Sequence, residues 1–236
     1  MNQLYKNYFP SHIFAFTSDR SVNYALKPTD QGFNEDQAEA INSTMDINSE
    51  HVYNIRQVHG NCIVFASKKD RGVSAEIEEA DGILTDEIAL PIAVRTADCL
   101  PVFIYDPKHK AIGIFHCGWQ STQKRILEKA LELMKKYYQT EPETLKVAFG
   151  PALRSCHFEV GEEFKDYFPG EVEERDGKNY FDIIRSNKSQ LVSGGVKAEN
   201  IHDSQVCTIC DDDCHSFRQE GDCSGRMLSV MMMRSE

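Results

Sequence analysis

The chain has 236 residues and a formal net charge of −11, with 37 acidic against 26 basic residues. This balance argues against a nucleic-acid partner, because such a partner usually needs a basic face. No run approaches the roughly 18 consecutive apolar residues of a membrane span, and the N-terminus lacks the pattern of a signal peptide. We therefore expect a cytoplasmic protein with no membrane partner. With 41% hydrophobic residues, the chain can bury one sizeable core, and we predict a single domain over residues 1–236.

The N-terminal part of the chain begins with a short apolar segment and a polar helix pattern. Residues 14–18 predict a strand, and residues 34–45 predict a helix. Eight cysteines in a chain of this length are too few for a disulfide scaffold, so most are expected to be reduced thiols.

Two segments then read as a pair of strands. Residues 52–58 alternate apolar and polar side chains, and the apolar run 62–66 resumes after a break at Gly60-Asn61. We interpret the pair as a β-hairpin with His59 at its turn. The charged stretch 68–79 is expected to be an exposed loop.

The centre of the sequence holds four apolar runs: residues 83–85, 91–94, 100–105 and 111–115. The later runs are rich in β-branched and aromatic residues and are nearly continuous. That composition is typical of strands buried on both faces. The last run ends at His116.

The clearest helix pattern follows, with apolar residues at spacings of three and four: Ile126, Leu127, Ala130, Leu131, Met134 and Tyr138. Ser121 or Thr122 is expected to cap its start. The free N–H groups of such a helix end favour an anion, so a phosphate near His116 is one prediction. The alternative is that the side-chain cap alone satisfies them.

The C-terminal part alternates strands and helices without a regular βαβ rhythm. The predicted strands are 145–149, 200–202 and 228–231, and the predicted helices are 158–168 and 181–192. The elements together indicate an α+β or mixed α/β fold.

Three residues are candidate metal ligands, namely His59, Cys99 and His116. Each lies at a predicted strand end or turn. Two imidazoles and one thiolate are good zinc ligands, and three protein ligands leave a fourth position for water or substrate. The same residues also fit a thiol nucleophile with a histidine base. From spacing alone, a buried free cysteine with two unrelated histidines is the favoured interpretation, because isolated His and Cys residues are common.

A second group of cysteines lies near the C-terminus: Cys207, Cys210, Cys214 and Cys223, with His215 beside the third. Two thiols at the Cys-x-x-Cys spacing allow a second zinc site. The favoured interpretation is a cysteine-rich loop without metal.

Several short motifs also occur in a defined order: Gln57-Val58-His59-Gly60, Ala80-Asp81-Gly82, Thr96-Ala97-Asp98-Cys99, His116-x-Gly118-Trp119, Gly150-Pro151 with Glu159-Val160-Gly161, and Phe217-Arg218 with Gly225-Arg226-Met227. With this ordered set the chain resembles the YfiH/laccase-domain family, also called LACC1-like or polyphenol-oxidase-like purine nucleoside phosphorylases. The resemblance extends from about Phe14 to about Met232.

The resemblance implies a layered α/β/β/α arrangement with mixed sheets, and a zinc-dependent enzyme. The implied reaction is phosphorolysis of adenosine, inosine and guanosine to the free base and ribose 1-phosphate. Adenosine deamination and cleavage of methylthioadenosine are implied as well. The expected partners are therefore a purine nucleoside and phosphate, while the oligomeric state stays open.

The resemblance also suggests roles for individual residues. Asn23 corresponds to a substrate-side asparagine, although a turn asparagine fits the local sequence as well. Gln57 and Arg218 complete the predicted substrate-binding set, since a guanidinium suits phosphate or ribose recognition. Asp98, beside Cys99, is a candidate for moving a proton or orienting a ligand, or for capping its own turn.

Three other functions remain open from the sequence. The first is a copper-dependent polyphenol oxidase, with copper as the alternative metal, although such enzymes usually need many histidines and this chain has eight. The second is a hydrolase with Cys99 as nucleophile. The third is a factor that edits peptidoglycan precursors. The chain contains no P-loop, dinucleotide fingerprint or Gly-x-Ser-x-Gly elbow, which argues against those sites.

Overall fold

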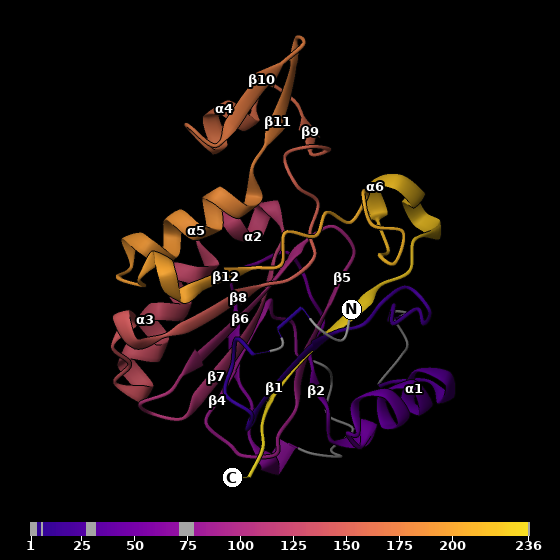
Figure 1. Ribbon diagram of the computed structural model, residues 1–236, viewed down its shortest axis with the longest axis vertical. Helices are drawn as coiled ribbons and strands as arrows, with labels where there is room; N and C mark the ends of the chain where they lie inside the picture. Colours follow the sequence, from indigo (N-terminus) through magenta and orange to yellow (C-terminus); the bar gives the residue numbers. More distant parts are fainter. Residues whose placement is uncertain (1–3, 6, 27–31, 71–77, 236) are drawn as a thin grey trace.

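Two mixed β-sheets form the centre of the molecule in the computed structural model, which describes residues 4–5, 7–26, 32–70 and 78–235. In spatial order the six-stranded sheet contains β12 (Ile201–Asp203), β8 (Lys146–Phe149), β6 (Leu100–Asp106), β7 (Ala111–Cys117), β4 (Gly82–Thr85) and β3 (Ile63–Phe65). The four-stranded sheet contains β1 (Ile13–Thr17), β13 (Met227–Met233), β5 (Ile92–Thr96) and β2 (Tyr53–Asn54). Figure 1 shows the strands of both sheets in the lower part of the molecule.

The long strands are buried on both faces, because the sheets are stacked and each is also covered on its outer side. In β6, Val102 and Ile104 belong to the core under the helices, whereas Phe103 belongs to the core between the sheets. In β13, Val230 packs on the outer side and Met231 between the sheets. This alternation explains the continuous apolar runs in the sequence.

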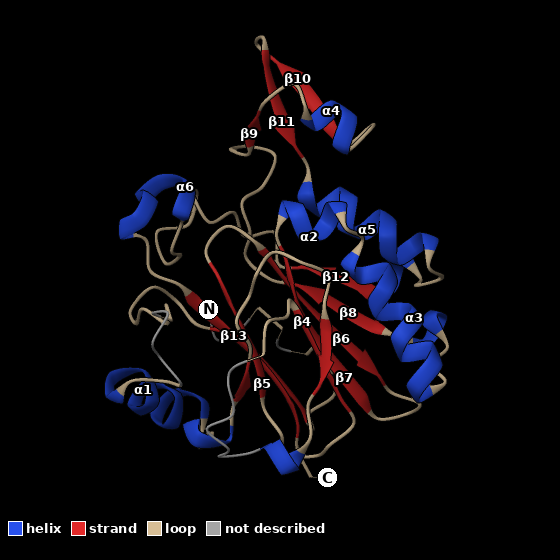
Figure 2. Ribbon diagram, turned by 180° about the vertical axis from the view of Figure 1, so that it is seen from behind, coloured by secondary structure: helices blue, strands red, loops and turns tan. Residues whose placement is uncertain are grey.

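Helices cover the two outer faces and complete four layers. The six-stranded sheet is covered by α2 (Trp119–Gln123), α3 (Ile126–Tyr138) and α5 (Ile183–Ser193), and the four-stranded sheet by α1 (Glu35–Met45). Figure 2 shows α1 on the opposite side of the strands from α3 and α5. The α/β/β/α arrangement with mixed sheets, implied by the resemblance, is confirmed.

A small third sheet, β10 (Val172–Arg175), β11 (Lys178–Phe181) and β9 (Glu159–Val160), projects away from the large sheets together with α4 (Phe164–Tyr167), as Figure 1 shows. The expected helix over 158–168 was therefore wrong except for its last turn. Its first residues pair instead with β11, because Asn179 and Tyr180 lie opposite Val160 and Glu159.

The predicted hairpin around His59 was also wrong. β2 pairs with β5 in the four-stranded sheet, and β3 pairs with β4 in the six-stranded sheet. The chain therefore crosses from one sheet to the other through His59. Alternation of side chains identifies a strand and its faces, but it does not identify the strand's partner. Of the expected loop 68–79, residues 71–77 lie outside the described residues, and Lys68–Asp70 form a 3-10 turn.

The helix after His116 is divided in two, so its predicted cap was wrong. Ser121 and Thr122 lie inside α2 and are buried, while α3 begins after Arg125, which has a φ of 58°. Thr122 accepts a hydrogen bond from the Asn187 side chain at 3.0 Å. It therefore ties α2 to α5 and caps neither helix.

The remaining helical turns are α6 (Phe217–Glu220) and the 3-10 turns Ser49–His51, Pro142–Thr144, Ala198–Asn200 and Gly221–Cys223. Over the described part of the chain, no helix combines the length and hydrophobicity needed to cross a membrane.

Candidate functional site

The structure brings His59, Cys99 and His116 together at one end of the two sheets. His59 lies in the crossing between the sheets, Cys99 follows β5, and His116 lies near the end of β7. Their ligand atoms are all within 4.8 Å of one another. The two imidazole rings meet edge to face, with centroids 4.8 Å apart. Residues that are 40 and 17 positions apart in the sequence therefore form one cluster, as the candidate metal site requires.

The backbone at this cluster has unusual conformations. His59 has a φ of 56° and Asp98, next to Cys99, a φ of 80°. Both values fall in the left-handed region of backbone conformations, which residues other than glycine seldom adopt. Such conformations persist only where the surrounding contacts hold them, and they are common at functional sites.

Asp81 supplies those contacts for His59. Its side chain is fully buried, and it accepts hydrogen bonds from the consecutive backbone N–H groups of Val58, His59 and Gly60 at 3.3, 3.0 and 2.6 Å. The same carboxylate accepts a bond from Nδ1 of His116 at 2.8 Å. One buried carboxylate therefore holds the turn that carries one imidazole and orients the other.

The bond to Asp81 also selects the tautomer of His116. Because Nδ1–H donates a hydrogen bond to a carboxylate, Nε2 is the ring nitrogen that is left to bind a metal. Burial raises the pKa of Asp81, but the bonds from His116, Gly60 and Val58 outweigh it and keep that pKa below its usual value. Asp81 is therefore ionised at neutral pH.

Sequence reasoning missed this residue as a functional group. The sequence presents Asp81 only as part of the motif Ala80-Asp81-Gly82, and it does not identify a carboxylate that orients the cysteine–histidine pair. The available signal was an aspartate between small residues at the start of the predicted strand 83–85. A charged residue in such a buried position requires partners that neutralise it.

The local electrostatics favour a thiolate at Cys99. Burial opposes ionisation of the thiol, but the charge and hydrogen bonds of His116, followed by those of His59, lower its pKa to about 6. Burial likewise opposes the charged form of His116, but Cys99 and Asp81 raise its pKa to about 9. Without a metal, a thiolate–imidazolium pair is thus the stable state between about pH 6 and 9.

Gly118 gives the cluster the space that it occupies. A Cβ at this position would lie 3.0 Å from Sγ of Cys99 and 3.1 Å from Cδ2 of His59. Both distances are tighter than nearly all real Cβ contacts. Neighbouring Cys117 is fully buried, and burial raises its pKa well above the usual value. Of the thiols of Cys99 and Cys117, only that of Cys99 is prepared to act as a ligand or nucleophile.

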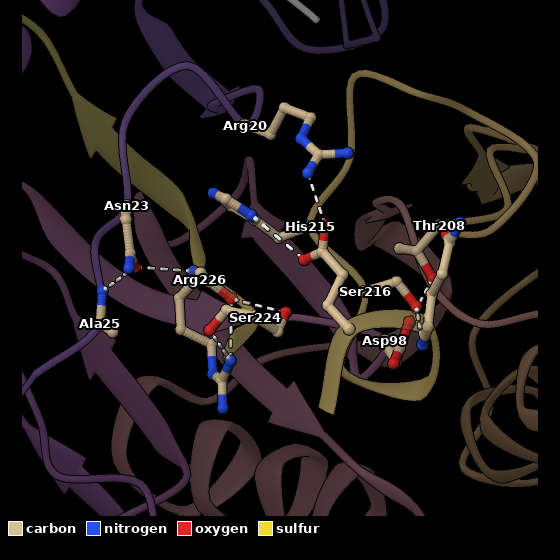
Figure 3. Close-up of polar contacts among 12 residues, drawn as sticks. Arg20, Asn23, Ala25, Asp98, Thr208, His215, Ser216, Ser224 and Arg226 are labelled. Carbon is tan, nitrogen blue, oxygen red and sulfur yellow. Dashed lines mark hydrogen bonds and ion pairs between the residues drawn. The ribbon is translucent and has the colours of Figure 1, made fainter. Parts of the chain in front are cut away.

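The structure directs the Asp98 carboxylate toward other loops. Its oxygens accept bonds from Oγ1 of Thr208 at 2.5 Å, shown in Figure 3, and from the backbone N–H of Arg218 at 2.6 Å. Its carbonyl accepts from the N–H of Leu153 at 2.8 Å. Asp98 therefore joins the Cys99 turn to two segments from the C-terminal part of the chain.

Two predicted substrate residues have their amide groups engaged with the backbone. The Asn23 side-chain oxygen accepts from the N–H groups of Ala25 at 2.8 Å and Arg226 at 3.0 Å (Figure 3), which is the behaviour of a turn asparagine. The Gln57 side chain donates to the carbonyl of Arg95 at 2.6 Å and accepts from its N–H at 2.8 Å. Gln57 therefore attaches the segment before His59 to β5.

Two exposed cations contact the segments that carry the cluster. Arg218, whose backbone contacts Asp98, donates to the carbonyl of Glu159 at 2.9 Å and stacks over Phe158 at 5.4 Å. Lys124, which the sequence reasoning overlooked, donates to the carbonyl of His59 at 2.9 Å. Both side chains are solvent-accessible, so a phosphate can reach them.

A family model matches most of the chain. Residues 17–234 match the model of the family described as multi-copper polyphenol oxidoreductase laccase. The chain belongs to this family.

Relatives within this laccase-like family bear the name purine nucleoside phosphorylase. One from Bacteroides thetaiotaomicron is 32% identical over 74% of this chain and 67% of its own length. One from Borreliella burgdorferi is 30% identical over 87% of this chain and 90% of its own length. The crystal structure of YlmD from Geobacillus stearothermophilus has a TM-score of 0.85 at 24% identity, covering 95% of this chain and 93% of that one. The crystal structure of YfiH from Bacillus licheniformis has a TM-score of 0.84 at 22% identity, covering 94% of this chain and 93% of that one.

Asp81→Asn tests the central hydrogen-bond network. An amide cannot match a carboxylate that accepts from three N–H groups and an imidazole, so metal affinity should fall by about 10–100-fold. Affinity is measured by competition with a chelator, beside circular dichroism to check folding. The matched control is Asp86→Asn, because Asp81 directly precedes β4 and the exposed Asp86 directly follows it. This variant should leave metal affinity unchanged. Equal affinities of the two variants would contradict the role given to Asp81.

Proposed function

We propose that this chain is a zinc-dependent purine nucleoside phosphorylase, which cleaves adenosine, inosine or guanosine with phosphate to the base and ribose 1-phosphate. The observation that carries the proposal is the cluster of His59, Cys99 and His116 with Asp81 bonded behind it. The names of the relatives support the reaction class.

The donor set fits a zinc ion. Two imidazole nitrogens and one thiolate would hold the metal and leave a fourth position for water or substrate. The bond from His116 to Asp81 is the carboxylate–histidine contact that usually supports a metal-binding imidazole. When bound there, zinc supplies a Lewis acid beside the reacting groups. Imidazole and thiolate ligands also suit copper, which remains the alternative metal in view of the family's description.

Phosphorolysis requires a place for a phosphate close to the cluster. Arg218 and Lys124 provide positive charge in a chain whose net charge is −11. The Arg218 backbone is bonded to Asp98, next to Cys99, and the Lys124 ammonium contacts the carbonyl of His59. We expect these two side chains to bind the phosphate, with the reacting end of the nucleoside at His59, Cys99 and His116.

An aromatic surface beside the cluster is suited to a purine base. Trp119 follows Gly118 directly, and its ring lies nearly parallel to that of Tyr167, at 7° with centroids 6.1 Å apart. Tyr167 is 42% exposed. Aromatic faces of this kind stack with bases irrespective of their hydrogen-bonding edges. This tolerance fits several purine substrates.

The same site would serve the other activities that we propose, which are deamination of adenosine and cleavage of methylthioadenosine. We expect small-molecule substrates without a nucleic-acid partner, and a cytoplasmic location.

A second candidate is a hydrolase in which Cys99 is the nucleophile. His116 would act as its base, and Asp81 would orient His116 through Nδ1. This candidate gains from Asp81, because the sequence alone identifies no carboxylate for a triad. The metal site remains preferred because His59 also faces the thiol, whereas a triad needs only one imidazole.

The reaction itself is tested with a panel of purine nucleosides and metal-analysed protein, with and without phosphate. We expect free base and ribose 1-phosphate from adenosine, inosine and guanosine only when phosphate is present. Products are separated by chromatography. Release of base at equal rates without phosphate would contradict phosphorolysis and indicate hydrolysis instead.

Cys99→Ser and Cys99→Ala separate ligand from nucleophile. If Cys99 is a ligand, both changes lower zinc occupancy, since a hydroxyl is a poorer zinc donor than a thiolate. Turnover should then fall in proportion to occupancy, and added zinc should restore part of it for the serine variant. Cys62 is an exposed cysteine three positions after His59. The control variant Cys62→Ser should retain both zinc occupancy and turnover. An inactive Cys99→Ala with full zinc occupancy would support the nucleophile.

A further inference from the structure

A second cluster of metal-ligating side chains lies in the loops that follow β8 and β12. Cys156 and His157 belong to the loop after β8, and Cys207 and Cys210 to the loop after β12. One ligand atom from each of the four lies within 4.8 Å of the others. Three thiols and one imidazole form a donor set that is common for structural zinc.

The separations between these atoms match those of a tetrahedral site. With Zn–S bonds of about 2.3 Å and Zn–N bonds of about 2.0–2.1 Å, tetrahedral angles require S···S distances of about 3.8 Å and S···N distances of about 3.5 Å. Sγ of Cys156 is 3.5 Å from Sγ of Cys207 and 3.9 Å from Sγ of Cys210. Nδ1 of His157 lies 3.3, 3.8 and 3.4 Å from Cys156, Cys207 and Cys210 respectively. The four atoms therefore already surround a zinc-sized centre.

Backbone bonds and one ion pair between side chains hold the two loops without using the ligand atoms. Ala152 and Cys207 form a parallel bridge. Arg154 binds the carboxylate of Asp203 through both of its terminal nitrogens, at 2.9 and 2.6 Å. The N–H of Cys210 donates to the carbonyl of Cys207 at 3.1 Å, which closes a tight turn between the two cysteines. The ligands are thus brought together by the fold, which lowers the conformational entropy lost when a metal binds.

The composition of the cluster corrects the sequence interpretation of this region. Cys207 and Cys210 are members of the cluster, but Cys214 and Cys223 are not. Cys214 is buried at 2% exposure, and Cys223 lies on the exposed 3-10 turn after α6. The missing ligands come from Cys156 and His157, about 50 positions earlier in the chain. Local Cys-x-x-Cys spacing could not reveal them.

We propose that Cys156, His157, Cys207 and Cys210 bind a structural zinc ion with four protein ligands. The site has no open coordination position, in contrast to the cluster of His59, Cys99 and His116. A single disulfide would use two of the three thiols and would leave His157 and the third cysteine without a partner in the cluster. The acidic run Asp211–Asp213 borders the same surface hollow as Cys207 and Cys210 and favours a cation there.

This zinc would hold the segments that support the first cluster. Thr208, between two ligands, donates to the Asp98 carboxylate, and Leu153 donates to the Asp98 carbonyl. The N–H of Glu159 donates to the carbonyl of His157, and the Glu159 carbonyl accepts from Arg218. The metal thereby joins both loops at the point from which they reach Asp98 and Arg218.

The test counts zinc in the full chain, purified under reducing conditions without added metal. We expect Cys156→Ser and Cys210→Ser each to hold one zinc fewer per chain than the wild type. Cys223→Ser, an exposed cysteine outside the cluster, should hold the wild-type amount. Cys99→Ala should remove only the zinc at the first cluster. Absence of zinc from the first cluster can therefore be distinguished from absence of zinc from the second. Unchanged zinc in both ligand variants would overturn the proposal.

A measurement on the wild-type chain keeps the test valid if a variant fails to fold. Cys156 and Cys210 are exposed, as are Cys62 and Cys223. Site-resolved alkylation should modify Cys62 and Cys223 at once, but Cys156 and Cys210 only after a strong chelator is added. Alkylation of all four at equal rates would overturn the proposal. So would a chain without zinc at these residues whose mass is lower by two hydrogens, since it would contain a disulfide.

Discussion

The buried carboxylate of Asp81 is the constraint on which the candidate site depends. An ionised group at zero exposure is stable only when it is fully hydrogen-bonded, and the partners of Asp81 are three consecutive backbone N–H groups and His116. Satisfying this charge therefore shapes the turn at His59 and orients the second imidazole. The left-handed backbone at His59 follows from the same contacts. Stability of the fold and geometry of the site are here one requirement.

The two stacked sheets explain why such distant residues meet. The chain leaves the four-stranded sheet after β2, passes His59, and enters the six-stranded sheet at β3. Cys99 lies in the opposite crossing, between β5 and β6, and Pro101 pairs with His116 on β7. Both crossings occur at the same end of the sheets. The site is thus built from connections between layers, whereas the strands and helices around it provide a rigid frame.

Much of this architecture was predictable from the sequence, and the exceptions have common physical causes. The continuous apolar runs around Phe103 and Ile114 report burial on both faces, and the ordered motifs indicated the layers and the three clustered residues. Pairing of β2 and β3 was not predictable, since alternation does not name a partner. Asp81 and Cys156 were missed because their roles depend on contacts between segments far apart in the chain. Gln57 and Asn23 resemble ligand-binding amides in sequence, but the structure bonds their side chains to the backbone.

The claim that Asp81 organises a metal centre is tested most directly by X-ray diffraction from crystals of the chain at wavelengths on either side of the zinc absorption edge. The account predicts an anomalous peak for a zinc ion that is bonded to Nε2 of His116, to Sγ of Cys99 and to the imidazole of His59. Nδ1 of His116 should still be hydrogen-bonded to Asp81. Density for a metal on Nδ1 of His116, or zinc-loaded crystals without a peak among these three residues, would contradict it.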